Sequence, residues 1–453
     1  MPQATPTQGK FVTGSTLKHV LNMTTSGSVG LIAVFAVDLL NLFYISLLGQ
    51  KELAAAVGYA GTLLFFMVSM SIGLTIAVSA LTSRALGRGQ REQAKHMAGT
   101  SLVLMVGSMA LGALALYPFV GSLLGLLGAS GTTAELAQRF TYWVLPSAPL
   151  LGAGMCLSAL LRALGDGKRA MYVTLSAAAA VAVLDPLFIF GLGWGLDGAA
   201  LATGVARVVM VCVGLYGLVR VHKLLARPTQ AELLATAKPF FAIGLPSILT
   251  QVATPVGNAF VTAAIAPFGD SAVAGWAIVG RIIPVAFAAL YGLSSAVGPI
   301  LGQNLGAAHY DRLRSTITDS LKVVVVYVLV IWLLMALFSG VIADAFGATG
   351  QARLVIVFFC QFVAASFVFN GAVFVANAVF NNLGFVLYST ALNWSRATLG
   401  VVPFIWLGGQ WYGVKGVLAG YGLGVVLFGL AGVWGCSKVL TTLEQRAKVP
   451  TLV

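Results

Sequence analysis

The sequence predicts an all-α polytopic membrane protein whose twelve transmembrane helices form two six-helix lobes, related by a parallel internal repeat. Three observations lead to this fold class: an apolar composition, twelve long apolar segments, and landmarks of the first half that recur in the second. Hydrophobic residues make up 59% of the 453 residues and charged residues 9%, against about 25% charged residues in a soluble domain. A cytosolic enzyme, a nucleic-acid-binding protein and a disordered scaffold are therefore excluded.

Each of the twelve apolar segments is long enough to cross a bilayer. A membrane-spanning helix needs about 20 apolar residues, and a chain in lipid satisfies its backbone internally only as a helix or a closed barrel. We expect the spans at residues 26–48, 54–82, 98–120, 136–162, 170–193, 198–221, 240–266, 272–301, 322–345, 354–381, 386–408 and 415–437. The resulting domains are a cytoplasmic N-terminal segment (1–25), an N-lobe (26–221), a cytoplasmic linker (222–239), a C-lobe (240–437) and a cytoplasmic tail (438–453).

Positive charge predicts the orientation. The net charge is +13, and with a cytoplasmic N-terminus 19 Lys and Arg residues fall on the cytoplasmic side against 4 on the other. The positive-inside rule then places both termini on the cytoplasmic side of the inner membrane. The N-terminus lacks a cleavable signal pattern, so the first apolar segment is expected to be retained. The four cysteines lie in apolar runs, and we expect small core residues rather than disulfides or metal ligands.

An internal repeat is indicated by three landmarks that recur at a nearly constant shift. The shift is 219 residues for the first two landmarks and 218 for the third. The landmark pairs are Leu86-Gly87 with Leu305-Gly306, Leu164-Gly165 with Leu383-Gly384, and Gly195-x-x-Gly198 with Gly413-x-x-Gly416. Because each half has six helices, the two halves insert with the same orientation, which suits alternating access between the two sides of a membrane.

Two acidic residues are the strongest functional candidates. Of the 13 Asp and Glu residues, only Asp38 and Asp185 lie well inside predicted helices. An ionised carboxylate in hydrocarbon is costly, so such residues face a cavity or take a proton; a buried salt bridge or a packed polar contact is the alternative. Asn41 shares a helix face with Asp38, and Thr203 and Arg207 are expected at similar depth. The sequence therefore predicts a polar cluster in the first lobe.

The chemistry of this cluster leaves alternatives open. Two neighbouring carboxylates exchange protons as a coupled pair, which suits proton binding and release. Arg207 would oppose this if it pairs with them, and otherwise lines the cavity wall or forms a structural bridge. Pro186 interrupts helix hydrogen bonding directly after Asp185, and it produces either an exposed carbonyl in the cavity or a simple packing kink.

The second lobe contains no intramembrane acid. Polar residues at membrane depth are more often interhelical hydrogen-bond partners than substrate contacts. The candidate cavity or substrate contacts of the whole chain are Tyr44, Arg207, Asn258, Arg281 and Asn370. No phosphate-binding loop, zinc motif or potassium-filter sequence occurs. An ATP-hydrolysing protein, a metalloenzyme and a selective potassium channel are therefore disfavoured, and no cofactor is expected.

Several runs of residues resemble the multidrug and toxic compound extrusion (MATE) family over almost the whole chain. These runs are Val37-Asp38, Leu161 to Asp166, Leu184-Asp185-Pro186 to Gly191, Gly195 to Thr203, and Gly302 to Gly306. The resemblance implies an antiporter that exports amphipathic, often cationic compounds while H+ or Na+ enters. It also implies a first-lobe cation site at Asp38, Asp185 and Thr203.

The chain departs from the family pattern at positions that affect the coupling ion. Val181 stands where the family often has an asparagine, which weakens a full oxygen shell for Na+. Thr254 and Asn370 stand where the NorM-like branch carries acids, and helix one lacks the proline common near its start. The resemblance is therefore closer to the DinF-like branch and favours H+.

We accordingly expect a monomeric proton-driven multidrug antiporter that is not an enzyme. Asp38 would be the obligatory proton carrier and Asp185 its partner, with Asn41, Thr203 and Tyr44 completing the cluster. Its partners would be amphipathic drugs or dyes and membrane lipid, without nucleic acid, and H+ or Na+ would be the coupling ion. The alternatives are a Na+-coupled drug antiporter of the same fold, a lipid-linked precursor flippase, and a membrane enzyme or scaffold without a transport cycle.

Overall fold

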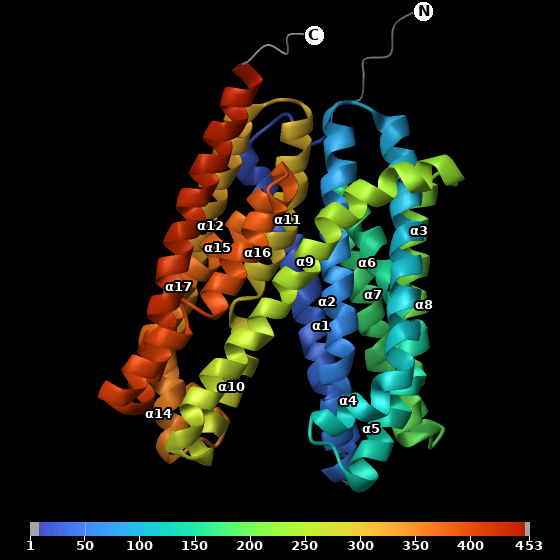
Figure 1. Cartoon of the computed structure of the whole chain (residues 1–453). Helices are drawn as coiled ribbons and strands as arrows, with labels where there is room; N and C mark the ends of the chain where they lie inside the picture. The colour runs from blue at the N-terminus through green and yellow to red at the C-terminus, as the bar shows by residue number, and fades with distance from the viewer. Residues whose placement is uncertain (1–8, 50, 449–453) are drawn as a thin grey trace, which may run out of the picture. The chain divides into compact units, whose positions relative to one another are not determined.

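The computed structural model describes residues 9–49 and 51–448, which form helices joined by short turns, with no strand among them (Figure 1). The chain divides into two compact units. Among the described residues, unit 1 holds 9–10 and Val29–Ile248, and unit 2 holds Phe11–Ser28 and the chain from Leu249 onward. The boundary between the halves therefore falls inside two long helices rather than in the linker.

The helices of each unit follow one another along the chain. Those of unit 1 are the end of α1 (Thr16–Ser46), α2 (Lys51–Gly87), α3 (Arg91–Leu116), η1 (Tyr117–Phe119), α4 (Val120–Leu126), α5 (Gly131–Val144), η2 (Leu145–Ser147), α6 (Ala148–Ala163), α7 (Gly167–Pro186), η3 (Leu187–Gly191), α8 (Gly195–Leu215), η4 (Tyr216–Val221) and the start of α9 (Gln230–Ile265). Those of unit 2 are the start of α1, the end of α9, η5 (Ala266–Phe268), α10 (Asp270–Ala286), α11 (Ala288–Gly306), α12 (Tyr310–Leu337), α13 (Ser339–Ala345), α14 (Gly350–Phe358), η6 (Phe359–Val363), η7 (Ala364–Ser366), α15 (Phe367–Leu383), α16 (Val386–Ala397) and α17 (Val402–Lys448).

The number of membrane spans agrees with the twelve expected from the sequence. Ten helices among the described residues are long and apolar enough to cross a bilayer, and α10 with α11, bent by 49°, adds an eleventh. One of the ten covers 62 residues, Val386–Ala447, which as a straight helix would be about 93 Å long, far beyond a hydrocarbon core of about 30 Å. It breaks at Tyr412 and Gly413, where Gly413 has φ +62°, and so supplies the twelfth span.

Backbone conformation confirms the internal repeat. Left-handed residues of the first half recur 218 to 220 residues later in the second half, each at a turn between helices or at a helix break. The pairs are Gly49 with Gly269, Gly89 with Ala308, Gly128 with Gly347, Gly131 with Gly350, Gly165 with Gly384, and Gly195 with Gly413. Since a positive φ is costly for residues other than glycine, a shared set of such positions indicates one ancestral chain path used twice.

The two long helices that are shared between the units also correspond in the repeat. In α1 the division falls between Ser28 and Val29, and in α9 between Ile248 and Leu249. Each unit is thus completed by half a helix from the other half of the chain. The first helix begins at Thr16, earlier than the expected span at residue 26.

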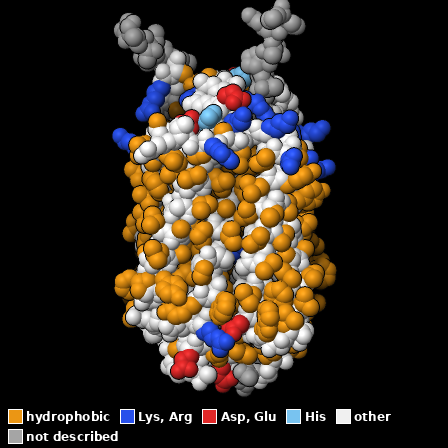
Figure 2. Space-filling view, turned by 90° about the vertical axis from the view of Figure 1, so that its right-hand side faces the viewer, with side chains coloured by type: hydrophobic (Ala, Val, Ile, Leu, Met, Phe, Trp, Pro, Cys, Tyr) orange, Lys and Arg blue, Asp and Glu red, His pale blue; other side chains and the backbone are white. Residues whose placement is uncertain are grey.

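Side-chain distribution fits a protein in lipid. Figure 2 shows apolar side chains covering the middle of the visible face, with most Lys and Arg side chains gathered at one end. The chain is therefore a multi-pass membrane protein. Of the four cysteines, which are all free, Cys156, Cys360 and Cys436 are buried as expected, whereas Cys212 is exposed. Cys212 lies on an outward face of α8. An apolar run does not distinguish such a face from a buried one, so the expectation of a core residue was wrong for this cysteine.

Candidate functional site

A buried carboxylate in unit 1 forms the centre of the candidate site. Asp185 lies at the end of α7 and is fully buried. Its Oδ2 accepts a hydrogen bond of 2.7 Å from Nδ2 of Asn41 on α1. Its Oδ1 has no hydrogen-bond partner among the described residues. A buried oxygen without a donor is costly, so this carboxyl group is suited to taking up a proton.

The local sequence explains how Asp185 is held. Pro186 ends α7, and the chain continues as the π-helix η3. Proline cannot donate a backbone hydrogen bond, and π-turns often mark functional sites. Helix α8 then packs closely, because a Cβ at Gly198 would lie only 2.7 Å from the carbonyl oxygen of Phe188.

Asp38 has a different environment from Asp185. It lies on α1 one helical turn before Asn41, and it is exposed rather than buried. No hydrogen bond or ion pair to its carboxylate occurs within the part of the chain that the structure describes. Because Asp38 and Asn41 share a helix face, the exposed acid lies on the same face of α1 as the amide that contacts the buried Asp185.

The remaining predicted members of the cluster do not contact Asp185 directly. The hydroxyl of Thr203 donates to the carbonyl of Ala199 within α8 at 3.0 Å, which leaves its oxygen free to accept. The ring of Tyr44 packs edge-on against Phe190 with centroids 6.3 Å apart. Thr203 and Tyr44 thus belong to the helices of the site, but their contacts here are packing and intrahelical contacts.

Arg207 does not pair with an acid. Its Nη1 donates to Oγ of Ser147 at 2.7 Å and to the carbonyl of Val144 at 3.3 Å. Among the described residues no ion pair joins it to Asp38 or Asp185. Of the alternatives left open by the sequence, a bridge from α8 to the turn before α6 is the one observed.

Sequence reasoning missed an open groove in unit 1 of about 920 Å³. The rings of Tyr117 and Tyr142 stack in it with centroids 4.5 Å apart. Its lining also includes Glu135, Gln138, Trp143, Ser147, Leu201, Gly204 and Val208. The only sequence signal was the run of polar and aromatic residues in the second half of α5, which is also typical of an interfacial aromatic belt.

The candidates of unit 2 fall into two groups. Asn258 and Arg281 are exposed on α9 and α10. Asn370 is buried, and its Oδ1 accepts a hydrogen bond from Nη1 of Arg396 at 3.2 Å. The structure therefore brings Asn370 together with a basic side chain of α16.

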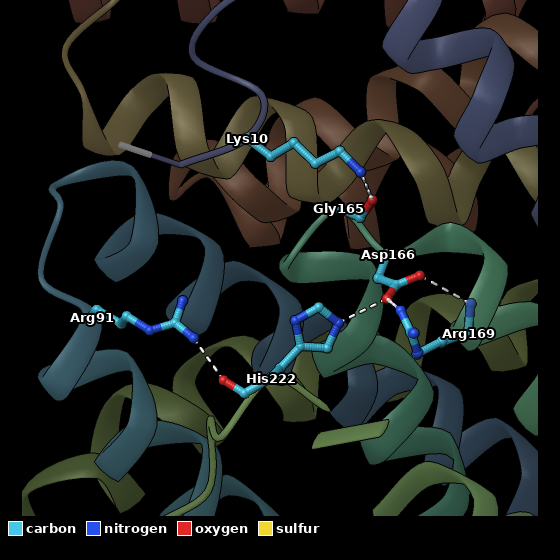
Figure 3. Close-up of polar contacts among 6 residues, drawn as sticks. All are labelled: Lys10, Arg91, Gly165, Asp166, Arg169 and His222. Atoms are coloured by element: carbon cyan, nitrogen blue, oxygen red, sulfur yellow. Dashed lines mark hydrogen bonds and ion pairs between the residues drawn. The ribbon is translucent and has the colours of Figure 1, made fainter. Parts of the chain in front are cut away.

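A second polar cluster lies at a turn of unit 1, before α7 (Figure 3). Oδ2 of Asp166 accepts from Nη1 of Arg169 at 2.6 Å and lies 2.7 Å from Nε2 of His222. Lys10 donates to the carbonyl of Gly165 at 2.7 Å, and Arg91 donates to that of His222 at 2.6 Å. Burial raises the pKa of Asp166, but the hydrogen bonds from Arg169 and His222 outweigh burial and hold it below its usual value. This cluster ties three turns and the N-terminal segment of unit 1 together.

Within the described residues, no group of three or more His, Cys, Asp or Glu side chains could hold a metal ion. The site instead consists of two acids of unequal exposure and an amide that contacts the buried acid, and none of the described basic side chains forms an ion pair with either acid. Such an arrangement can bind and release a proton.

Comparison with known proteins agrees with the fold and its repeat. The sequence profile of the MatE family matches the chain twice, at residues 28–187 and 246–407, and the two matches start 218 residues apart. Long apolar helices in two repeated units of the described chain are the architecture of a polytopic membrane protein. The chain belongs to the MatE family of transporters.

Individual relatives cover nearly the whole chain. A Shewanella oneidensis protein named FAD transporter is 29% identical over 91% of this chain and 92% of its own. The multidrug export protein MepA of Staphylococcus haemolyticus is 25% identical over 90% of each chain. The crystal structure of the Vibrio cholerae MATE transporter VcmN in the bent form matches with a TM-score of 0.90 and 26% identity, over 95% of this chain and 98% of that one. The DinF-like assignment remains a prediction.

Proposed function

We propose that this chain is a proton-driven antiporter of the inner membrane that exports amphipathic organic compounds, with Asp38 as the proton carrier and Asp185 as its coupled partner. Family membership and the MepA relative support export of small molecules. The observation that carries the coupling proposal is the presence of two acids in unit 1 without a basic partner among the described residues, where Asp185 contacts Asn41 on the helix face that also carries Asp38.

The two acids take different roles because their surroundings differ. The Asp38 side chain is exposed on the surface of unit 1, and in this proposal it exchanges protons with an aqueous phase. Asp185 is buried with one unpartnered oxygen, so its charge state depends on whether Asn41 stays in contact. Protonation of Asp38 removes a charge from α1, which changes the cost of exposing this helix to lipid or to a closed cavity. That change favours the other access state of the transporter.

The available oxygen atoms favour H+ over Na+. A sodium ion needs several oxygen ligands, in keeping with the preference of hard cations for oxygen. Asn41 turns its amide nitrogen toward Asp185, and Val181 offers no side-chain oxygen. A proton needs only one accepting oxygen. Oδ1 of Asp185 and the carboxylate of Asp38 can each provide one.

The driving force is sufficient for useful export. One proton moving down 100 mV releases about 2.3 kcal/mol, and each pH unit adds about 1.4 kcal/mol. One proton per cycle therefore supports a substrate gradient of roughly a few hundredfold, since about 1.4 kcal/mol corresponds to a factor of ten.

A second candidate function is export of a flavin nucleotide. The Shewanella oneidensis protein named FAD transporter has a higher identity to this chain than MepA has, over a similar share of the chain. The same two acids would serve as the coupling site. Counterflow of FAD, compared with ethidium, into proteoliposomes would separate the two substrates.

The proposed coupling is tested by efflux from proteoliposomes under separately imposed pH and Na+ gradients. We expect ethidium efflux with the pH gradient and little change when Na+ is replaced by K+. Asp38→Asn cannot carry a proton and should reduce gradient-driven efflux to the level of protein-free vesicles. Glu92→Gln, which makes the same chemical change at an exposed position of α3, should match the wild type.

Two results would refute the proposal. Efflux by Asp38→Asn at the wild-type rate would remove Asp38 as carrier. A strict requirement for Na+ would make this chain a sodium antiporter despite Val181.

A further inference from the structure

Unit 2 contains a buried arginine without a matching acid. Arg396 lies in the last turn of α16 and is only 8% exposed. Its Nη1 donates to Oδ1 of Asn370 at 3.2 Å, and its Nε has no hydrogen-bond partner among the described residues. A buried charge is normally paired with an opposite charge, because taking it out of water is costly. Arg396 therefore has unused capacity to bind an anion.

The acidic residues of unit 2 do not supply the missing charge. No ion pair within the described chain joins any of them to Arg396. Asp319 contacts Thr16 and Lys322. Asp344 and Glu444 each form an ion pair with an exposed arginine. The described acids of unit 2 are Asp270, Asp311, Asp319, Asp344 and Glu444.

The surroundings of Arg396 combine polar and aromatic groups. The phenol groups of Tyr291 and Tyr421 contribute to the electrostatic environment of its guanidinium group. The half-buried ring of Tyr291 packs against that of Phe374 with centroids 5.2 Å apart. Arginine with an amide and hydroxyl groups suits a carboxylate or phosphate, and the neighbouring rings suit an aromatic group.

A polar path continues from Arg396 along α15 and α16. Asn377 lies two helical turns after Asn370 on the same face of α15. Its Oδ1 accepts from Ser389 at 2.8 Å and from Asn393 at 2.7 Å. The arginine is thus one end of a series of polar side chains between two helices, rather than an isolated polar residue.

The position of Arg396 along α16 argues against a lipid headgroup as the anion. Helix α16 starts at Val386, and ten residues of helix rise about 15 Å. That is half of a hydrocarbon core of about 30 Å, whereas lipid phosphates lie at the edges of the core. We therefore expect an anion at Arg396 to belong to a molecule bound inside the protein.

We propose that Arg396 and Asn370 bind the carboxylate or phosphate group of an aromatic substrate in unit 2. This inference rests on the proposed function only in taking the chain to be a transporter of small molecules. The competing explanation is that Arg396 only interacts favourably with the C-terminal end of α16. In that case removing the charge of Arg396 would not change the preference of the protein for one ligand over another.

The test uses two probes that share one fluorescent ring, riboflavin and riboflavin 5′-phosphate. The ribityl chain separates the ring from the phosphate, so the phosphate can reach a buried arginine while the ring stays near Tyr291 and Phe374. Binding to the full-length protein in nanodiscs is measured at equilibrium without a gradient. We expect the wild type to bind the phosphate form more tightly, and Arg396→Gln to lower its affinity about tenfold or more, with riboflavin affinity changed less than twofold.

Matched variants distinguish binding from folding. Arg353→Gln makes the same change at an exposed arginine that pairs with Asp344 in unit 2, and it should retain the preference. Arg396→Lys keeps the charge but loses the fork of donors, and it should retain part of the preference if Arg396→Gln does not fold. Asp38→Asn should also retain it, so a failure of proton coupling does not affect this test.

Three outcomes would overturn the inference. One is equal affinity of the wild type for both probes. A second is an equal loss of affinity for both probes in Arg396→Gln together with a fall in its thermal stability. That result would indicate that Arg396 has a structural role. The third is loss of the preference when phosphatidylglycerol is added to the nanodiscs, which indicates that a lipid phosphate occupies the arginine.

Discussion

Unit 1 and unit 2 have the same sequence of turns but opposite buried charges. In unit 1, Asp185 is buried and Asp38 is accessible, and no described base pairs with either. In unit 2, Arg396 is buried, and no described acid pairs with it. The left-handed turns that recur between the halves show that this contrast was built on one duplicated scaffold.

The contrast teaches how a duplicated transporter can divide its tasks. Backbone turns and close helix contacts are needed in both halves, so they are retained at equivalent positions. Membrane-depth charges are costly in either half, so each must provide a function that offsets its cost. We assign proton coupling to the acids of unit 1 and substrate anion binding to the base of unit 2.

The largest effect should be on proton-driven efflux, and it should distinguish Asp185 of unit 1 from Asp319 of unit 2. Asp185→Asn can still bond to Asn41 but cannot take a proton, so we expect roughly a tenfold loss of proton-driven efflux, within the usual range of coupling energies. The same change at Asp319 in unit 2, where the carboxylate contacts Thr16, should leave efflux within about twofold of wild type. Efflux is measured between pH 6 and 8. If Asp185→Asn matches the wild type across that range, the coupled pair does not exist.

A smaller effect should show that the equivalent glycines of both units serve close packing. A Cβ at Gly416 would overlap the carbonyl oxygen of Gly408, and one at Gly198 would lie 2.7 Å from that of Phe188. Overpacking costs about 1–3 kcal/mol, so both alanine variants should unfold at a lower temperature than the wild type. The decrease should be larger for Gly416→Ala than for Gly198→Ala. Gly107→Ala, with open space around it, is the control and should not be destabilised. Equal melting temperatures for all three variants would contradict the shared packing role.

The smallest effect concerns a feature that unit 1 has and unit 2 lacks. Asp166 caps α7, and the equivalent cap of α16 is Phe385, without a side-chain hydrogen bond. The hydrogen bonds to Asp166 lower its pKa, so their stabilisation is present above the ordinary carboxyl value of about 4 and is lost as pH falls through the lowered value.

Asp166→Asn should therefore reduce stability by about 1 kcal/mol or less at neutral pH, and the difference from wild type should vanish under strongly acidic conditions. Thermal unfolding from pH 7 to 3 measures it. A difference that persists unchanged to the lowest pH would show that the charge of Asp166 does not contribute.

Much of the site could be anticipated because charge is so rare in this chain. Asp38 and Asp185 were recognised because carboxylates within apolar segments are few, and Asn41 because helix periodicity places it beside Asp38. Periodicity does not give the rotation of one helix against another. It therefore could not show that Asn41 contacts Asp185, or that Arg207 turns toward Ser147.

The amino-acid sequence by itself determined the membrane-spanning helices, the duplication and the turns, since these depend on apolar length and on glycine at positions of positive φ, which are local properties. Only the tertiary structure decided which polar groups meet, because helix rotation and depth follow from the packing of many small side chains at once. The buried Arg396 of unit 2 is the clearest case. Its position can be read in the sequence, but only the folded structure shows that none of the described acids pairs with it.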